Sequence, residues 1–259
     1  MRVLLLGSGT SVPGMRAAPG ILVVSEDRSL LIDPGPGATH RLGAAGIDPT
    51  SVDDILITHT HPDHVTDLVP FLFCLRNPRY GDPVLPRLIA PEGFTAFYEQ
   101  LRAPFAKWLP APGEGITIVE HVGGDRAPVP LESGGFRLIG EKVQHLPSSL
   151  AWRITDIRGT TFAYSGDTER CPGVVRAASD ASLLFLECST PSGIEVPGHL
   201  EPVSASAVIR ASGARRIVLV HLNPECDEVD LVGQFDGDVR DRVELGRDGA
   251  WYTVEAGDR

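Results

Sequence analysis

Four side chains of metal-binding type fall within six residues: His59, His61, Asp63 and His64. In extended backbone, residues two apart point the same way, so His59 and His61 can bind one ion together. Pro62 favours the start of a helix, which turns Asp63 and His64 toward a second position beside the first. Imidazole and carboxylate groups are the ligands of zinc and similar divalent cations, so this segment predicts a metal site.

More residues of the same kind stand where predicted apolar strands end or where a glycine turn begins. They are His145, Asp167, Glu187, His221 and, after Gly198, His199. Because open α/β sheets place their sites at one edge, we expect strand-end residues of this kind to meet there. His40 and His121 lack such a context and are interpreted as structural.

The elements that must position these residues are predicted from apolar periodicity and turn residues. We expect strands at 2–7, 20–25, 29–33, 54–57, 88–91, 116–121, 136–144, 150–157, 160–165, 183–187 and 217–220, and helices ending near Ala45 and at 65–76, 93–101 and 201–211. Residues 243–254 are predicted to form a hairpin that turns at Asp248-Gly249. Residues 102–115 are interpreted as a surface loop, with a mobile wall over the site as the alternative.

Asp33 follows a predicted strand and precedes a turn rich in proline and glycine. One interpretation is an ordinary turn or cap aspartate. The other is a carboxylate that orients a ligand histidine, which is a common partner of metal-bound imidazole. The sequence leaves both open.

The composition excludes several classes of protein. The chain has 259 residues, of which 42% are hydrophobic and 22% charged, as in ordinary globular proteins. The early apolar run at residues 3–6 is too short for a signal peptide or a membrane span, so we expect a cytoplasmic protein without a membrane partner. Four scattered cysteines predict neither a disulfide framework nor a zinc ribbon. A net charge of -11 weighs against broad nucleic-acid binding but allows a small anionic substrate.

Taken together, the motifs resemble those of the metallo-β-lactamase superfamily, and within it the ribonuclease Z-like and cyclic phosphodiesterase branches. The matching motifs lie at residues 6–11, 31–35, 59–64, 145–153, 165–168, 187–189 and 220–222. The resemblance implies a single α/β domain over residues 1–259, folded as a four-layer αββα sandwich with two metals in a cleft at its edge. It also implies a homodimer.

The resemblance further implies a role for each candidate site residue. His59, His61 and His145 hold one metal, Asp63, His64 and His221 hold the other, and Asp167 bridges them. Zinc is the expected metal, with manganese or iron as alternatives. A hydroxide shared by the two ions is the expected nucleophile, with Asp63 among the catalytic residues. His199 is expected to protonate the leaving group, against the alternative of a structural or helix-capping histidine.

The substrate class is predicted from the spacing between His145 and Asp167. Ribonuclease Z enzymes generally insert a long basic arm there, whereas this chain has the 21 residues 146–166. Together with the net charge, this predicts a small phosphodiester, such as a cyclic nucleotide or a cyclic phosphate sugar. The alternatives are tRNA 3′ processing, hydrolysis of a lactone, thioester or aryl sulfate, and a non-catalytic scaffold that keeps the fold.

Overall fold

Two seven-stranded sheets form the centre of the computed structural model, which describes residues 1–123, 131–133 and 135–255. The first sheet contains β1 (Arg2–Gly7), β2 (Gly20–Ser25), β3 (Arg28–Ile32), β4 (Asp54–Leu56), β5 (Arg87–Pro91), β6 (Ile118–His121) and β14 (Ala250–Thr253). The second contains β7 (Leu131–Ser133), β8 (Phe136–Lys142), β9 (Leu150–Asp156), β10 (Thr161–Tyr164), β11 (Leu183–Glu187), β12 (Ile217–Val220) and β13 (Val243–Leu245). Their strand orders are β14-β1-β2-β3-β4-β5-β6 and β13-β12-β11-β10-β9-β8-β7.

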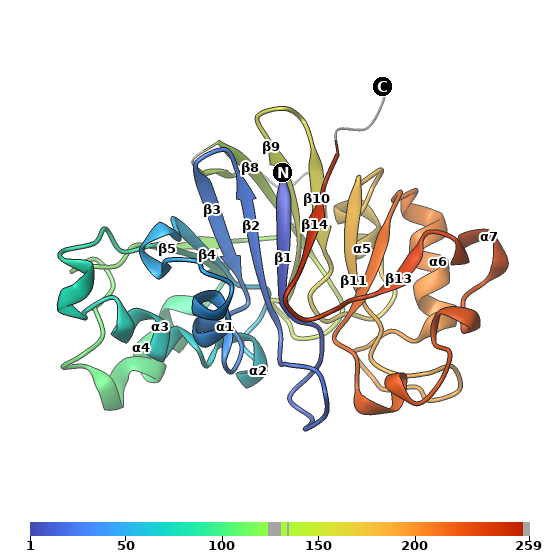
Figure 1. Ribbon diagram of the computed structural model, residues 1–259, viewed down its shortest axis with the longest axis horizontal. Coiled ribbons are helices and arrows are strands. Elements are labelled where there is room, and N and C mark those ends of the chain that lie inside the picture. Colours follow the sequence, from blue (N-terminus) through green and yellow to red (C-terminus); the bar gives the residue numbers. More distant parts are fainter. Residues whose placement is uncertain (124–130, 134, 256–259) are drawn as a thin grey trace.

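Helices cover the outer face of each sheet, and Figure 1 shows the two groups on opposite sides of the strands. The first group is α1 (Ala38–Ala44), α2 (Pro62–Val65), α3 (Leu68–Cys74) and α4 (Phe94–Arg102), and the second is α5 (Pro172–Ala177), α6 (Pro202–Ser212) and α7 (Gly237–Arg240). Short 3-10 turns lie at Pro49–Ser51, Pro78–Tyr80, Ala103–Phe105, Pro224–Asp227 and Val232–Gln234. The predicted αββα sandwich is therefore confirmed.

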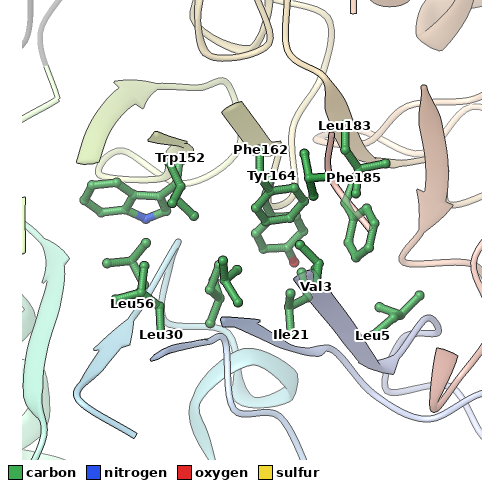
Figure 2. Packing of buried hydrophobic residues seen from close by; sticks show 14 of the residues in the cluster. Val3, Leu5, Ile21, Leu30, Leu56, Trp152, Phe162, Tyr164, Leu183 and Phe185 are labelled. Carbon is green, nitrogen blue, oxygen red and sulfur yellow. The ribbon is translucent and has the colours of Figure 1, made fainter. Parts of the chain in front are cut away.

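Large apolar side chains fill the space between the sheets. Figure 2 shows Trp152, Phe162, Tyr164, Leu183 and Phe185 of the second sheet opposite Val3, Leu5, Ile21, Leu30 and Leu56 of the first. Burying each such side chain contributes roughly 1.5–3 kcal/mol to folding. Strands β11 and β12 are buried on both faces, because helices cover their other side, which explains their unbroken apolar sequences.

Parallel pairing sets where the functional residues lie. Strands β3, β4, β5 and β6 run parallel to one another, as do β10, β11, β12 and β13. The carboxyl ends of parallel strands meet at one edge of a sheet, so the segments that follow β3, β4, β10, β11 and β12 come together there. Each predicted ligand at a strand end lies in a segment that follows one of these parallel strands. His145 is the exception.

The helix predicted to begin at Val65 begins instead at Leu68, as α3, because the preceding helix α2 ends at Val65 and the two are separated at Thr66-Asp67. Pro70 is the reason. A single helix through this region would place Pro70 in its interior, where it lacks the N–H donor and its ring clashes with the preceding turn. By restarting at Leu68, α3 places Pro70 in its first turn, where no donor is needed.

The hairpin predicted at 243–254 is wrong, because its two strands belong to different sheets. β13 pairs in parallel with β12, whereas β14 pairs antiparallel with β1. The Asp248-Gly249 turn is thus a crossover between the sheets. The carboxylate of Asp248 fixes it by accepting hydrogen bonds from the backbone N–H of Ser8 (2.8 Å) and of Ala17 (2.6 Å).

Residues 102–115 form the 3-10 turn at Ala103–Phe105 followed by irregular chain. They pack against α3, where Trp108 meets Phe73 edge to face, and the two segments enclose an apolar groove of about 350 Å³. A mobile wall over the site stays a prediction. Among the described residues, none of the helices has the length and apolar character needed to cross a membrane.

Candidate metal centre and active site

The segment from His59 to His64 is anchored to both sheets. It follows β4, and the backbone carbonyls of Ile57 and Thr58 accept hydrogen bonds from the Trp152 indole and from Leu150 N, both at 3.0 Å. His61 has extended backbone and caps α2, which begins at Pro62 as the sequence predicts. The change from extended chain to helix brings Asp63 and His64 next to His59 and His61.

Asp167 lies at the centre of the histidine side chains. Its Oδ2 is 3.5 Å from His59 Nε2, 3.8 Å from His145 Nε2 and 3.2 Å from His221 Nε2. Its Oδ1 is 3.4 Å from His64 Nε2. One carboxylate therefore faces ligand atoms from four histidines with both of its oxygens, which is the arrangement expected of a bridging ligand.

The candidate ligand atoms form four overlapping groups, within each of which all atoms lie within 4.8 Å of one another; one combines Asp33 with His59 and His64, and another combines Asp167 with His199 and His221. The remaining two groups contain only residues predicted to bind metal. The first group is His59, His61, His145 and Asp167, and the second is Asp63, His64 and His221. This is the division that the sequence resemblance implies. The structure thus brings together all seven residues that were predicted to bind metal.

Hydrogen bonds outside the cluster fix which nitrogen of each imidazole is free. Four histidines engage Nδ1 with an acceptor: His59 with Thr58 Oγ1 (3.0 Å), His64 with Asp33 Oδ2 (2.8 Å), His145 with the Gly198 carbonyl (3.0 Å) and His221 with Ser189 Oγ (3.0 Å). In the neutral imidazole, Nδ1 donates its proton outward, and Nε2 is the nitrogen that faces the cluster with its lone pair. His61 differs, since its Nδ1 faces His145 Nε2 at 3.1 Å.

The cluster fits divalent cations. Among the described residues, Nε2 of His59, His64 and His221 and Oδ1 of Asp167 are buried without a hydrogen-bond partner. Leaving such atoms unsatisfied is costly, and convergent lone pairs on nitrogen and carboxylate oxygen are what zinc, manganese or iron would satisfy.

Charge and burial hold most of these groups in forms that bind metal. Burial and the neighbouring His64 lower the pKa of His59 to about 2, which keeps its imidazole neutral. Burial opposes ionisation of Asp167, but His221 and His64 outweigh it and hold its pKa well below the usual range. His64 is the exception. Burial would lower its pKa, yet Asp167 and Asp33 raise it well above the ordinary value, so metal binding there displaces a proton.

Asp33 orients ligand histidines. Its carboxylate accepts from Thr58 N (2.8 Å), Thr58 Oγ1 (2.6 Å) and His64 Nδ1 (2.8 Å), and the side chain is fully buried. Its backbone has a φ of 45°, a left-handed conformation that aspartate tolerates better than most residues. Of the two interpretations left open by the sequence, the structure supports the orienting carboxylate.

His199 borders the cluster on the side of α6. Its ring stacks on that of His221 with centroids 5.3 Å apart and lies 5.0 Å from that of His145. It also lines an open pocket of about 470 Å³ between residues 169–170 and 195–204. His199 thus lies between the ligand histidines and a space large enough for part of a substrate.

Glu187 was named in the sequence analysis only as a strand end, but it is the principal partner of His199. Its Oε1 is 3.1 Å from His199 Nδ1 and accepts from Thr168 N at 2.6 Å, while Oε2 accepts from Ser189 Oγ at 2.9 Å. It is fully buried. A carboxylate that ends an otherwise apolar strand is the sequence signal that identifies it.

The two histidines set aside as structural lie apart from the cluster. His40 is exposed on α1. His121 accepts a hydrogen bond from Gly140 N (2.9 Å) through Nε2, and its ring lies against Trp152. Within the part of the chain that the structure describes, neither belongs to a group of residues that could hold a metal.

Comparison with known proteins places the chain in a family. Residues 28–222 match the model of the Beta-lactamase superfamily domain. The uncharacterized protein Rv1339 of Mycobacterium tuberculosis is 29% identical over 248 residues, which are 92% of this chain and 88% of that protein. Ribonuclease Z of Streptomyces coelicolor is 26% identical over 275 residues and the match covers 90% of each chain. The crystal structure of a diphosphatase from the PhnP family superposes with a TM-score of 0.78 at 20% identity, over 98% of both chains.

The family match spans the strands and turns that supply every ligand from His59 to His221. The fold, the order of the motifs and the converging ligand groups agree with it. The chain belongs to the metallo-β-lactamase superfamily, in its ribonuclease Z-like branch.

Proposed function

We propose that this metallo-hydrolase is a dinuclear phosphodiesterase that acts on a small phosphodiester or cyclic phosphate. The observation that carries the proposal is the position of Asp167, whose Oδ2 faces His59 of the first group and whose Oδ1 faces His64 of the second. Two divalent cations bound by these ligands would lower the pKa of a water molecule and stabilise negative charge on the phosphate oxygens.

The residues of the chain supply the remaining parts of the reaction. Asp63 is more accessible than Asp167, with a side chain that is 12% rather than 2% exposed. The family resemblance supports Asp63 as a further catalytic residue of this proposal. Asp33 and Thr58 hold the ligand histidines in the required orientation and need no movement during catalysis.

His199 is the proposed general acid. With Nδ1 held by Glu187, its Nε2 is the atom that remains to give a proton to the leaving oxygen. Burial would lower the pKa of His199, but the hydrogen bond and charge of Glu187 raise it above the ordinary value. A raised pKa favours the protonated imidazole, which is the state that a general acid needs.

A small substrate is favoured by the chain between His145 and Asp167. Residues 146–166 are fully described and consist of a short turn and the β9–β10 hairpin. They leave no segment there that could extend as an RNA-binding arm. A tRNA 3′ endonuclease remains the second candidate, because a relative with similar coverage is named ribonuclease Z.

We also propose a cytoplasmic homodimer. All four cysteines are free thiols in the structure, as expected in a reducing compartment, whereas the dimer rests on the resemblance alone. Sedimentation of the purified protein measures the oligomeric state directly.

A substrate panel tests the proposed activity. Protein loaded with zinc or manganese is assayed on a bis-aryl phosphodiester, cyclic nucleotides, precursor tRNA, a lactone and an aryl sulfate, with Asp167→Ala as the control for contaminating hydrolases. We expect hydrolysis of the small phosphodiesters. Preference for the lactone or the sulfate, or equal activity of the variant, contradicts the proposal.

A further inference from the structure

Glu169 connects the loop that carries His199 to the strand end that carries His145. Its Oε1 accepts from Gly198 N at 2.8 Å, and its Oε2 accepts from the side-chain amide of Gln144 at 2.6 Å. Its own backbone N–H donates to the Gln144 carbonyl at 2.9 Å. The half-buried carboxylate therefore bridges two segments that are distant in sequence.

Gly198, whose N–H is held by Glu169, contacts His145 and directly precedes His199 in the sequence. The carbonyl of Gly198 accepts from His145 Nδ1 at 3.0 Å, and its peptide leads directly into His199. Gly198 has a φ of +86°, and a Cβ there would lie 2.7 Å from His145 Nδ1. Glycine is thus required at this position. Because glycine has more backbone freedom than any other residue, the hydrogen bond from its N–H to Glu169 restricts the orientation of its peptide.

We propose that Glu169 is a positioning residue, which holds the Gly198 peptide so that His199 and His145 keep their mutual geometry. The kinetic part of this inference rests on the proposed phosphodiesterase function. The Gly198 carbonyl is the direct partner of His145. Removing partners of that kind typically changes metal affinity or activity by about 10–100-fold, and Glu169 acts on His145 through this peptide.

The role is one of geometry rather than charge, and conservative substitutions separate the two. In Glu169→Gln, the amide oxygen can accept from Gly198 N while its NH₂ donates to Gln144, whose own amide rotates to present oxygen. Both contacts then persist without the charge. Glu169→Asp keeps the charge, but its shorter side chain cannot span both partners.

Glu120 provides a matched control in the first sheet. Its carboxylate accepts from Gly93 N (2.8 Å) and Thr95 N (2.7 Å) at the start of α4, so it also tethers a glycine N–H, but at the edge strand β6 and away from the ligand groups. Glu120→Ala reports the general consequence of losing such a tether.

The experiment combines deuterium exchange with kinetics at saturating metal. Exchange of residues 195–200 should speed up in Glu169→Asp and Glu169→Ala, because the tether that limits local opening is lost, and should stay near the wild-type rate in Glu169→Gln and Glu120→Ala. Hydrolysis of an alkyl phosphodiester should fall by about 10–100-fold in the Asp and Ala variants, and recover most of that loss in the Gln variant. A nitrophenyl diester, which scarcely needs an acid, should lose less.

A double variant links the effect to His199. Adding Glu169→Ala to His199→Ala should cause a smaller loss on the alkyl diester than Glu169→Ala causes alone, because the part of its contribution that acts through His199 is already removed. The assignment is overturned if the Asp variant behaves as wild type, if the Gln variant is as impaired as the Ala variant, or if the two losses multiply. Should the wild-type protein cleave neither diester, the proposed function fails, while the exchange rates still decide whether Glu169 tethers the loop.

Discussion

At the scale of single residues, the metal centre depends most on Asp167, because its carboxylate faces both ligand groups. We predict that Asp167→Ala will reduce the metal content from two ions per chain toward none and abolish hydrolysis, since the remaining histidines would bind two cations without a shared negative charge between them. Elemental analysis of the purified variant measures this. His40→Ala, an exposed histidine on α1, should change neither quantity. Full metal content and turnover in the aspartate variant would show that the bridging assignment is wrong.

His199 can be tested through the leaving group. An alkoxide needs protonation as it departs, whereas a nitrophenolate scarcely does. His199→Ala should therefore slow hydrolysis of an alkyl diester by about 10²–10⁴-fold and affect a nitrophenyl diester far less, with both metals retained. Equal losses on the two substrates, or loss of metal, would instead assign His199 a structural role.

At the scale of elements, the β9–β10 hairpin decides the predicted substrate size. With only this hairpin between His145 and Asp167, the chain has no basic segment there to neutralise RNA phosphates, and the net charge of -11 repels them. We predict that a small phosphodiester will be cleaved more efficiently than precursor tRNA at physiological salt, as competition assays can measure. Efficient, position-specific trimming of the tRNA 3′ end at that salt would restore the ribonuclease interpretation.

The sequence identifies most of the residues that converge in the structure because they share a local signal. His59 and His61 follow a strand and Pro62 starts a helix, while Asp167 and His221 follow apolar strands that end at one edge. Glu187 carries a weaker form of that signal, a charge closing an apolar run. Glu169 carries none, since its importance arises from a contact with Gly198, 29 residues away, that no local pattern encodes.

The two wrong predictions about strands and helices also arise from contacts that no local sequence pattern encodes. The Asp248-Gly249 turn has the local chemistry of a hairpin, but whether the flanking strands pair with each other depends on vacant edges beside β1 and β12, which only the assembled sheets provide. The division between α2 and α3 follows from Pro70, whose effect depends on where a helix restarts. Local sequence therefore specifies the strands and turns better than their partners.

At the scale of the whole molecule, the expected single domain predicts a single unfolding transition. Residues of both sheets form one apolar cluster between them, and the crossover at Asp248 joins the sheets covalently, so unfolding of either sheet exposes the cluster that they share. Calorimetry should show one cooperative transition. Metal at 100 times its dissociation constant should add about 2.7 kcal/mol to the free energy of unfolding for each ion bound. Two separate transitions would contradict a single domain.

The most direct test of the central claim, a two-metal phosphodiesterase, is a metal titration of activity. Metal-free protein is titrated with zinc or manganese while hydrolysis of a small phosphodiester is followed. Because the seven ligands form two groups joined by Asp167, we predict that activity will rise to a plateau at two equivalents per chain. A plateau at one equivalent, or hydrolysis that does not depend on added metal, would contradict the account.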